Sequence, residues 1–151
     1  MTNLPAMPID TSKQGTTYDA AEFEVEAARI SQYADAVHEE NPVHRDAEAA
    51  KAAGFKDVVA PPMFAVVYSA PAMGPAIWDA IGDMLPRMVH GGQEFVWAEP
   101  VCAGDTITTQ ATLAEVYEKD GKGFFVFESV SKNQDGDEVV TATWTNIVRG
   151  V

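Results

Sequence analysis

From Pro62 to Ala70 the chain reads PMFAVVYSA, a stretch in which nearly every residue is apolar. Proline suits the first turn of a helix, where its missing N–H group is not needed, so Pro62 favours a helix here over a buried strand. A helix that is apolar on every side is stable only when protein surrounds it. We therefore expect a helix over residues 62–70 in the centre of the domain, ended by Pro71 and by the pair Gly74-Pro75.

The second half of the chain predicts a β-sheet that can enclose this helix. Polar and apolar residues alternate in four segments, which is typical of strands with one buried face. These segments are residues 93–98, 107–117, 124–131 and 139–148. The pair Asp135-Gly136 favours a hairpin turn before the last strand. Four strands joined by short connections predict an antiparallel meander curled around the apolar helix, and hence an α+β fold.

The first half of the chain predicts an arm followed by short elements. Residues 1–15 are rich in Pro, Thr and Ser and predict a flexible N-terminal arm, while residues 16–151 are enough for a single domain. The expected elements are a strand over residues 18–24, an amphipathic helix over residues 24–37, a short helix over residues 47–53 after the N-cap Asp46, and a lid-like helix or loop over residues 76–88.

Charge and composition exclude several classes of function. Ten basic and 23 acidic residues give a formal charge of −13, which argues against binding to nucleic acid. The apolar runs are too short to span a membrane, and the N-terminus shows no pattern typical of a secretory signal. The single cysteine, Cys102, cannot form an internal disulfide, so we expect a reducing compartment, the cytoplasm.

Residues 38–44 read HEENPVH and contain the best candidates for chemistry. The Asn41-Pro42 step breaks a helix, because proline lacks an N–H group and restricts the residue before it. Glu39 and His44 therefore lie on an irregular loop, where a carboxylate and an imidazole could converge on one small molecule. The alternative is that this loop only connects two helices and that Glu39 is a solvated charge.

Several segments in a fixed order resemble the MaoC-like hydratases and dehydratases. They are residues 33–37 (YADAV), 39–44 (EENPVH), 58–64 (VVAPPMF), 89–95 (VHGGQEF) and 100–107 (PVCAGDTI). More narrowly, they are similar to the branch that resembles the dehydratase domain of fungal-type fatty acid synthase. The resemblance covers residues 16–149 and implies the hot-dog fold, an antiparallel sheet wrapped around a central apolar helix.

The resemblance also implies an activity and a site. The family's loop motif is Asp-x-Asn-Pro-x-His, whose carboxylate and histidine hold the water that is added across the double bond of a trans-2-enoyl thioester, or removed from a 3-hydroxyacyl thioester. Glu39 stands at the Asp position, and Asn41, Pro42 and His44 match. His44 would be the base, since histidine can take a proton near neutral pH, and Glu39 the acid. The substrate-binding residues implied by the resemblance are Asn41, Pro62, Met63, His90 and Gly91.

Two positions depart from the family pattern. Glu39 is one methylene longer than Asp, and a displacement of about 1 Å in an active site can cost about a hundredfold in rate. Pro62 occupies the position of a glycine whose N–H group helps to hold the thioester oxygen as negative charge develops on it. The amide of Met63, at a helix N-terminus, could substitute. His90 could instead be a packing residue at the start of a strand.

We expect a hydro-lyase, an enoyl-CoA hydratase or 3-hydroxyacyl-thioester dehydratase, that acts on an acyl-CoA thioester. The alternatives are a non-catalytic acyl-binding subunit of a heteromeric MaoC-type dehydratase and, less favoured, a thioesterase, for which residues 61–70 lack a carboxylate. The phosphates of coenzyme A could be held if Arg45, Lys56, Arg87 or Arg149 gather, while the negative charge disfavours an acyl carrier protein.

No cofactor and no metal are expected, because the three histidines lack the spacing of a metal site. Since a single hot-dog domain buries one sheet edge against a second copy, we expect at least a dimer. The partner would be an identical chain or another MaoC-like chain, with residues 93–96 at the seam.

Overall fold

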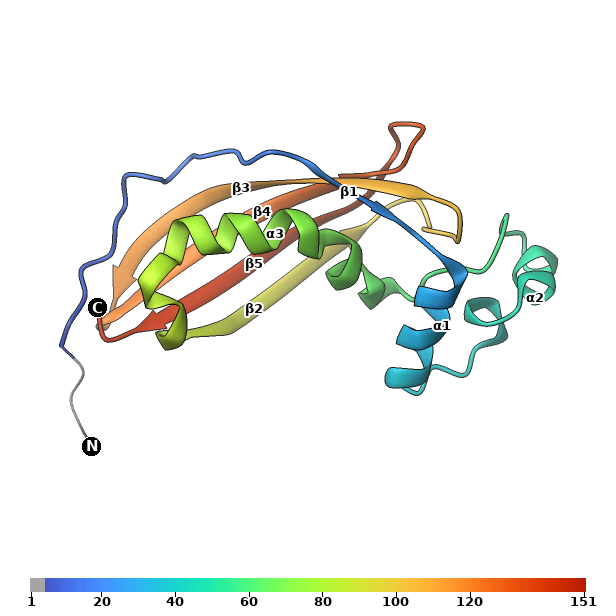
Figure 1. Ribbon diagram of the computed structural model, residues 1–151, viewed down its shortest axis with the longest axis horizontal. Coiled ribbons are helices and arrows are strands. Elements are labelled where there is room, and N and C mark those ends of the chain that lie inside the picture. Colours follow the sequence, from blue (N-terminus) through green and yellow to red (C-terminus); the bar gives the residue numbers. More distant parts are fainter. Residues whose placement is uncertain (1–4) are drawn as a thin grey trace.

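A long helix, α3 (Ala65–Ile81), lies along the inner face of a curled five-stranded sheet in the computed structural model, which describes residues 5–151 (Figure 1). The 3₁₀ helices η2 (Pro62–Phe64) and η3 (Gly82–Arg87) precede and follow it. The strands are β1 (Ala21–Glu24), β2 (Met88–Trp97), β3 (Thr106–Lys119), β4 (Lys122–Lys132) and β5 (Glu138–Arg149), in the sheet order β1-β3-β4-β5-β2. This arrangement confirms the predicted α+β architecture, an antiparallel sheet around a central apolar helix.

The central helix is longer than predicted. It continues through Pro71 and Pro75, so the expectation that these prolines end the helix was wrong, and residues 76–88 form its last turns, η3 and the first residue of β2 rather than a separate lid. Proline inside a helix removes the hydrogen bond to the carbonyl group four residues earlier. Both prolines lie on the exposed face of α3, where water can bond to the freed carbonyl groups. The opposite face packs into the core through Ala65, Tyr68, Ser69, Ala72, Met73, Ala76 and Ala80.

The predicted meander is confirmed for β3, β4 and β5, but β2 was misplaced. It pairs antiparallel with β5, with Met88 opposite Val148 and Trp97 opposite Val140, and the chain then crosses the sheet to β3. The strand also begins five residues earlier than predicted, because a β-bulge at Gly91 interrupts its alternation. The predicted hairpin at Asp135-Gly136 is present, and Gly136 has a φ of 83°, which glycine adopts without strain.

Alternation along the strands divides the sheet into a buried inner face and an open outer face. In β5 every second side chain from Val140 to Val148 is buried, as expected for a strand with one face on the core. Inward residues of β3, β4 and β5 pack against the second half of α3, around Leu113, Phe125, Phe127 and Trp144. A second cluster surrounds the first turns of α3, where Phe64 meets Ile30 and Ile107.

The segment before α3 forms a small lobe beyond one end of the sheet (Figure 1). It contains α1 (Ala27–Ala36), the 3₁₀ helix η1 (Pro42–His44) and α2 (Ala47–Ala52), close to the helices predicted over residues 24–37 and 47–53. Asp46 caps α2 as predicted, because its carboxylate accepts the Glu48 N–H group at 3.1 Å. The lobe carries the loop of residues 38–44 to the N-terminal end of α3.

Residues 5–15, the described part of the predicted arm, run beside β3 (Figure 1). Gly15 N–H donates to the Leu113 carbonyl at 2.7 Å, and Met7 N–H donates to the Gly150 carbonyl at 3.1 Å. The flexibility of the arm remains a prediction, since hydrogen bonds in one conformation do not give their rate of opening. None of the helices between residues 5 and 151 is both long and apolar enough to cross a membrane.

The two outer strands of the sheet differ in length. β1 has four residues and β2 has ten, and no strand of the described chain pairs with the outer edge of β2. Such an edge presents a row of free backbone N–H and C=O groups to a partner. Residues 93–96, predicted to lie at a dimer seam, belong to this edge strand, and the seam itself stays a prediction.

Candidate active site

A cavity of about 300 Å³ lies where the lobe meets η2 and the ends of β2 and β5. Its walls are mostly apolar, as is usual for a pocket that binds a small molecule. The residues that line it are His44, Phe55, Val59, Ala60, Pro62, Tyr68, Trp97, Ala98, Glu99, Pro100, Val101 and Val139. It contains His44 and Pro62, two of the residues that the sequence predicted for the site.

His44 is fixed by its own short helix and by a carbonyl group that is distant in the sequence but close in space. The Asn41 side chain caps η1 by accepting the Val43 N–H group at 3.2 Å, and Pro42 starts the turn. The ring Nδ1 of His44 lies 2.7 Å from the Val59 carbonyl oxygen, and only 9% of the residue is exposed. Because a carbonyl oxygen can only accept, Nδ1 carries the hydrogen, and the neutral ring has its lone pair on Nε2. His44 can therefore act as a base toward a molecule in the cavity.

The Val59 carbonyl is held in turn by a short pairing between two segments. Val59 forms a β-bridge with Cys102, Ala60 N–H donates to the Val101 carbonyl at 2.8 Å, and Ala103 N–H donates to the Val58 carbonyl at 2.8 Å. Residues 58–60 and 101–103 thus form a two-stranded support behind the imidazole.

Asp105 anchors this support from the core. Its carboxylate, 1% exposed, accepts the Cys102 N–H group at 2.8 Å and the Gln134 side-chain amide at 2.9 Å, and it forms an ion pair with Lys56. Burial by itself would raise the pKa of Asp105, but these donors outweigh it and hold the pKa below its ordinary value. Cys102 beside it is buried, and burial raises the pKa of its thiol, so the thiol is a packing group rather than a nucleophile.

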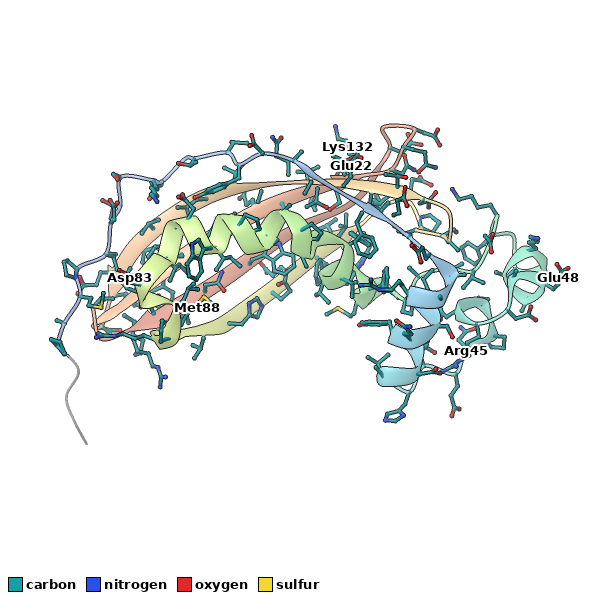
Figure 2. All side chains as sticks on the ribbon, viewed as in Figure 1. Glu22, Arg45, Glu48, Asp83, Met88 and Lys132 are labelled. Carbon is teal, nitrogen blue, oxygen red and sulfur yellow. The ribbon has the colours of Figure 1, made fainter. Side chains whose placement is uncertain are left out.

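Glu39 does not face His44 across the cavity. Its carboxylate accepts the Asn41 N–H group at 2.9 Å, within the loop, and Glu39 is not among the residues that line the cavity. Arg45 lies in the lobe (Figure 2). It fixes the loop from outside, because Nε donates to the Glu39 carbonyl at 2.6 Å and Nη1 pairs with Asp35 of α1 at 2.6 Å. Glu39 and His44 are therefore close in the sequence, but only His44 lines the cavity.

The other predicted binding residues are dispersed. Asn41 caps η1 and is exposed, and Met63 is also exposed and does not line the cavity. His90 and Gly91 lie on β2, away from the cavity, where the His90 ring packs edge-on to Trp144 with centroids 6.3 Å apart. Gly91 forms the bulge, and a side chain there would meet Ile147.

The basic residues considered for the phosphates of coenzyme A do not gather at one place. Arg45 pairs with α1 in the lobe, and Lys56 pairs with Asp105. Arg87 donates to the Pro5 and Gly150 carbonyls, near the C-terminus and at the opposite end of the molecule from the lobe (Figure 1). Arg149 precedes Gly150 and shares that end. The local cluster that the hypothesis required is therefore not formed.

Sequence reasoning missed several walls of the cavity. Phe55 and Glu99 gave no signal because they lie on connections, and Trp97 was read only as a strand residue. The Trp97 ring N–H group donates to the Pro62 carbonyl at 3.1 Å, which ties the end of β2 to η2. Tyr68 belongs to the predicted central helix, where it packs against Phe64, and it also lines the cavity.

The matching family is described as the FAS1-like, dehydratase domain region, and it covers residues 12–142. The chain belongs to this FAS1-like dehydratase-region family. A UPF0336 protein from Saccharopolyspora erythraea is 38% identical to it over 146 residues, with 95% of this chain and 94% of the relative covered.

Solved structures agree with the fold of this FAS1-like dehydratase-region protein. A chain of the HadBC (3R-hydroxyacyl-ACP dehydratase) complex from Mycobacterium tuberculosis matches with a TM-score of 0.81 and 25% identity, covering 91% of this chain and 98% of that one. The R-hydratase PhaJ1 from Pseudomonas aeruginosa matches with a TM-score of 0.71 and 21% identity, covering 91% and 83%. The suspected MaoC-like superfamily and the hot-dog fold are therefore confirmed.

Proposed function

We propose that this protein is a hydro-lyase that adds water to trans-2-enoyl thioesters, or removes it from 3-hydroxyacyl thioesters, with coenzyme A as the carrier. The observation that carries the proposal is the orientation of His44, whose Nδ1–H group is bonded to the Val59 carbonyl while the residue lines an apolar cavity. In the neutral imidazole, a hydrogen held on Nδ1 leaves the lone pair on Nε2, where a general base requires it.

The reaction needs a base, an acid and one water molecule held between them and the double bond. In hydration, His44 Nε2 takes a proton from water as the water oxygen bonds to the β-carbon, and the Glu39 carboxylic acid gives a proton to the α-carbon. For this step the Glu39 side chain must turn from the Asn41 N–H group toward the cavity, a change of rotamer within the same loop. Dehydration follows the same path in reverse.

Kinetics of the purified chain test this proposal. A short trans-2-enoyl-CoA is mixed with the protein, and hydration is followed by loss of the conjugated absorbance. His44→Ala and Glu39→Gln are each expected to lower kcat by a factor of about 100 or more. The matched control is His38→Asn in the same loop, since asparagine tolerates the left-handed conformation of residue 38, where φ is 57°. Full activity in His44→Ala or Glu39→Gln would contradict the proposal.

A second candidate function is the acyl-binding subunit of a heteromeric dehydratase, in which another chain supplies the catalytic pair. Two observations favour it: the Glu39 carboxylate lies outside the cavity, and Pro62 has no N–H group to offer the thioester oxygen. The HadBC dehydratase, one chain of which this chain resembles, is described as a complex. This candidate predicts an inert isolated chain that gains activity when it is mixed with a MaoC-like partner.

We place the partner, identical or related, on the open edge of β2. Two copies of this chain would each bring a charge of −13, so self-association should strengthen with added salt, which screens the repulsion. Light scattering after size exclusion, at low and high salt, measures this. A monomer under both conditions would contradict homodimer formation.

Buried Cys102 fits our expectation of a reducing compartment such as the cytoplasm.

A further inference from the structure

The reaction proposed above places negative charge on the thioester oxygen, and the cavity must supply a hydrogen-bond donor for it. Among the described residues that line the cavity, the side chains with an N–H or O–H group are His44, Tyr68 and Trp97. The Nδ1–H group of His44 is bonded to the Val59 carbonyl, and the ring N–H group of Trp97 is bonded to the Pro62 carbonyl. Tyr68 is the remaining side-chain donor.

The hydroxyl group of Tyr68 has no hydrogen-bond partner within residues 5–151, although the residue is only 3% exposed. It is also not one of the fully buried polar atoms without a partner, which are Ser69 Oγ, Gln93 Oε1 and Asn146 Nδ2. The hydroxyl therefore keeps some open space beside it. Tyr68 lines the cavity, so a ligand held there lies beside its side chain.

The position of the ring is set by rigid surroundings. Tyr68 lies in the first turn of α3, where its ring packs edge-on against Phe64 with centroids 6.2 Å apart. Burial raises the pKa of its phenol, so the hydroxyl stays protonated at neutral pH and can donate a hydrogen bond. A donor held on a helix needs no rearrangement as charge develops, which is the requirement for stabilising a transition state.

We propose that the Tyr68 hydroxyl donates a hydrogen bond to the carbonyl oxygen of the bound enoyl thioester, and so takes the place of the backbone N–H group that Pro62 lacks. The hydrogen stays on Tyr68 throughout, so no bond to tyrosine forms or breaks. This inference rests on the proposed function for the substrate class. It adds a catalytic residue on the central helix.

The test is Tyr68→Phe, which removes the hydroxyl and keeps the ring. We expect kcat for enoyl-CoA hydration to fall by about 100-fold, as when one oxyanion donor is removed, with little change in KM. The matched control is Tyr33→Phe, since Tyr33 also packs edge-on against Phe64, at 5.4 Å, but does not line the cavity. A kcat of Tyr68→Phe equal to that of the unmodified protein would overturn the inference and leave the hydro-lyase proposal standing.

A spectroscopic measurement does not depend on turnover. The carbonyl stretch of a bound enoyl-CoA is recorded in His44→Ala and in the double variant His44→Ala/Tyr68→Phe. A hydrogen bond lowers this frequency, so we expect the band to move upward when the hydroxyl is removed. An unshifted band would overturn the inference, and so would the absence of bound thioester. A shifted band, together with an unmodified protein that turns over no thioester, would support the hydrogen bond from Tyr68 and overturn the hydro-lyase proposal alone.

Discussion

At the scale of single residues, the imidazole of His44 depends on a chain of contacts that ends at a buried carboxylate. Asp105 holds the Cys102 N–H group, Cys102 pairs with Val59, and the Val59 carbonyl orients the ring. A change at Asp105 should therefore weaken both the fold and the site, although this residue does not touch the cavity.

Asp105→Asn should lower the free energy of unfolding by about 1–3 kcal/mol at neutral pH, because a buried, charge-assisted set of hydrogen bonds is lost. The folded-state pKa of Asp105 lies below its unfolded value, so its contribution is present above the unfolded pKa and is lost as pH falls through the folded pKa. The difference between variant and unmodified protein should therefore shrink in acid. Urea unfolding at several pH values measures it, with exposed Asp137→Asn as the control. A difference that grows as pH falls would contradict this assignment.

The sequence proposes Glu39 and His44 as candidates because both belong to one local motif, and of the two only His44 lines the cavity. It does not reveal the Val59 carbonyl, 15 residues from His44, since that contact depends on the pairing of residues 58–60 with 101–103. The same reason hides Phe55, Trp97 and Glu99. Cavity walls assembled from separate loops leave no periodic pattern to find.

At the scale of elements, β2 contains a bulge at Gly91, and the strand starts earlier than its alternation predicted. Gly91 lies against the Ile147 side chain, so Gly91→Ala should cost about 1–2 kcal/mol in the free energy of unfolding. The double variant Gly91→Ala/Ile147→Val should recover part of this loss, because it removes the methyl group in the way. Thermal or urea unfolding checks both. The control is Gly74→Ala in α3, where a side chain meets open space and should stabilise by about 0.5–1 kcal/mol. Simple additivity in the double variant would contradict the steric explanation.

The helix α3 offers a second test at this scale. Pro71 lies on its exposed face and removes one backbone hydrogen bond, so Pro71→Ala should raise the free energy of unfolding. The gain should be about 1 kcal/mol, since proline also restricts the unfolded chain and that advantage is lost. Urea unfolding measures the change. A less stable variant would show that the proline ring itself makes a favourable contact.

The prolines also explain why the length of α3 was not predictable. The apolar pattern of residues 62–70 was sufficient for the helix and its burial, but proline is read locally as a helix breaker. What carries the helix past Pro71 and Pro75 is the packing of its other face on the sheet, which only the folded chain provides. The pairing of β2 with β5 was not predictable for the same reason, because it depends on contacts that only the folded chain provides.

At the scale of the whole molecule, the N-terminal arm is tied to α3 as well as to the sheet. Asp79 accepts hydrogen bonds from the Lys13 ammonium at 3.0 Å and from the Tyr18 hydroxyl at 3.1 Å. Burial and this carboxylate raise the pKa of Tyr18 to about 12. The arm therefore links segments that are far apart in the sequence.

Removing this link should loosen the arm while the core stays intact. In Asp79→Ala, we expect faster hydrogen exchange at the amides of Gly15 and Tyr18, which donate to the Leu113 and Ala111 carbonyls. Amides in β4, such as Phe125, should be unaffected. Fast exchange at Gly15 already in the unmodified protein would favour the flexible arm predicted from the sequence. Equal exchange in both proteins would show that Asp79 does not hold it.

The ten-residue edge of β2 also bears on how the protein is made in a cell. Its residues include one charged side chain, Glu94, and neither lysine nor proline, the residues that commonly keep such edges from joining at random. A newly synthesised chain would therefore tend to aggregate through this edge until a partner chain pairs with it. If the partner is a second MaoC-like chain, as in the heteromeric candidate, production without it should yield aggregated or rapidly degraded protein, and co-expression of both chains should restore the yield of soluble protein.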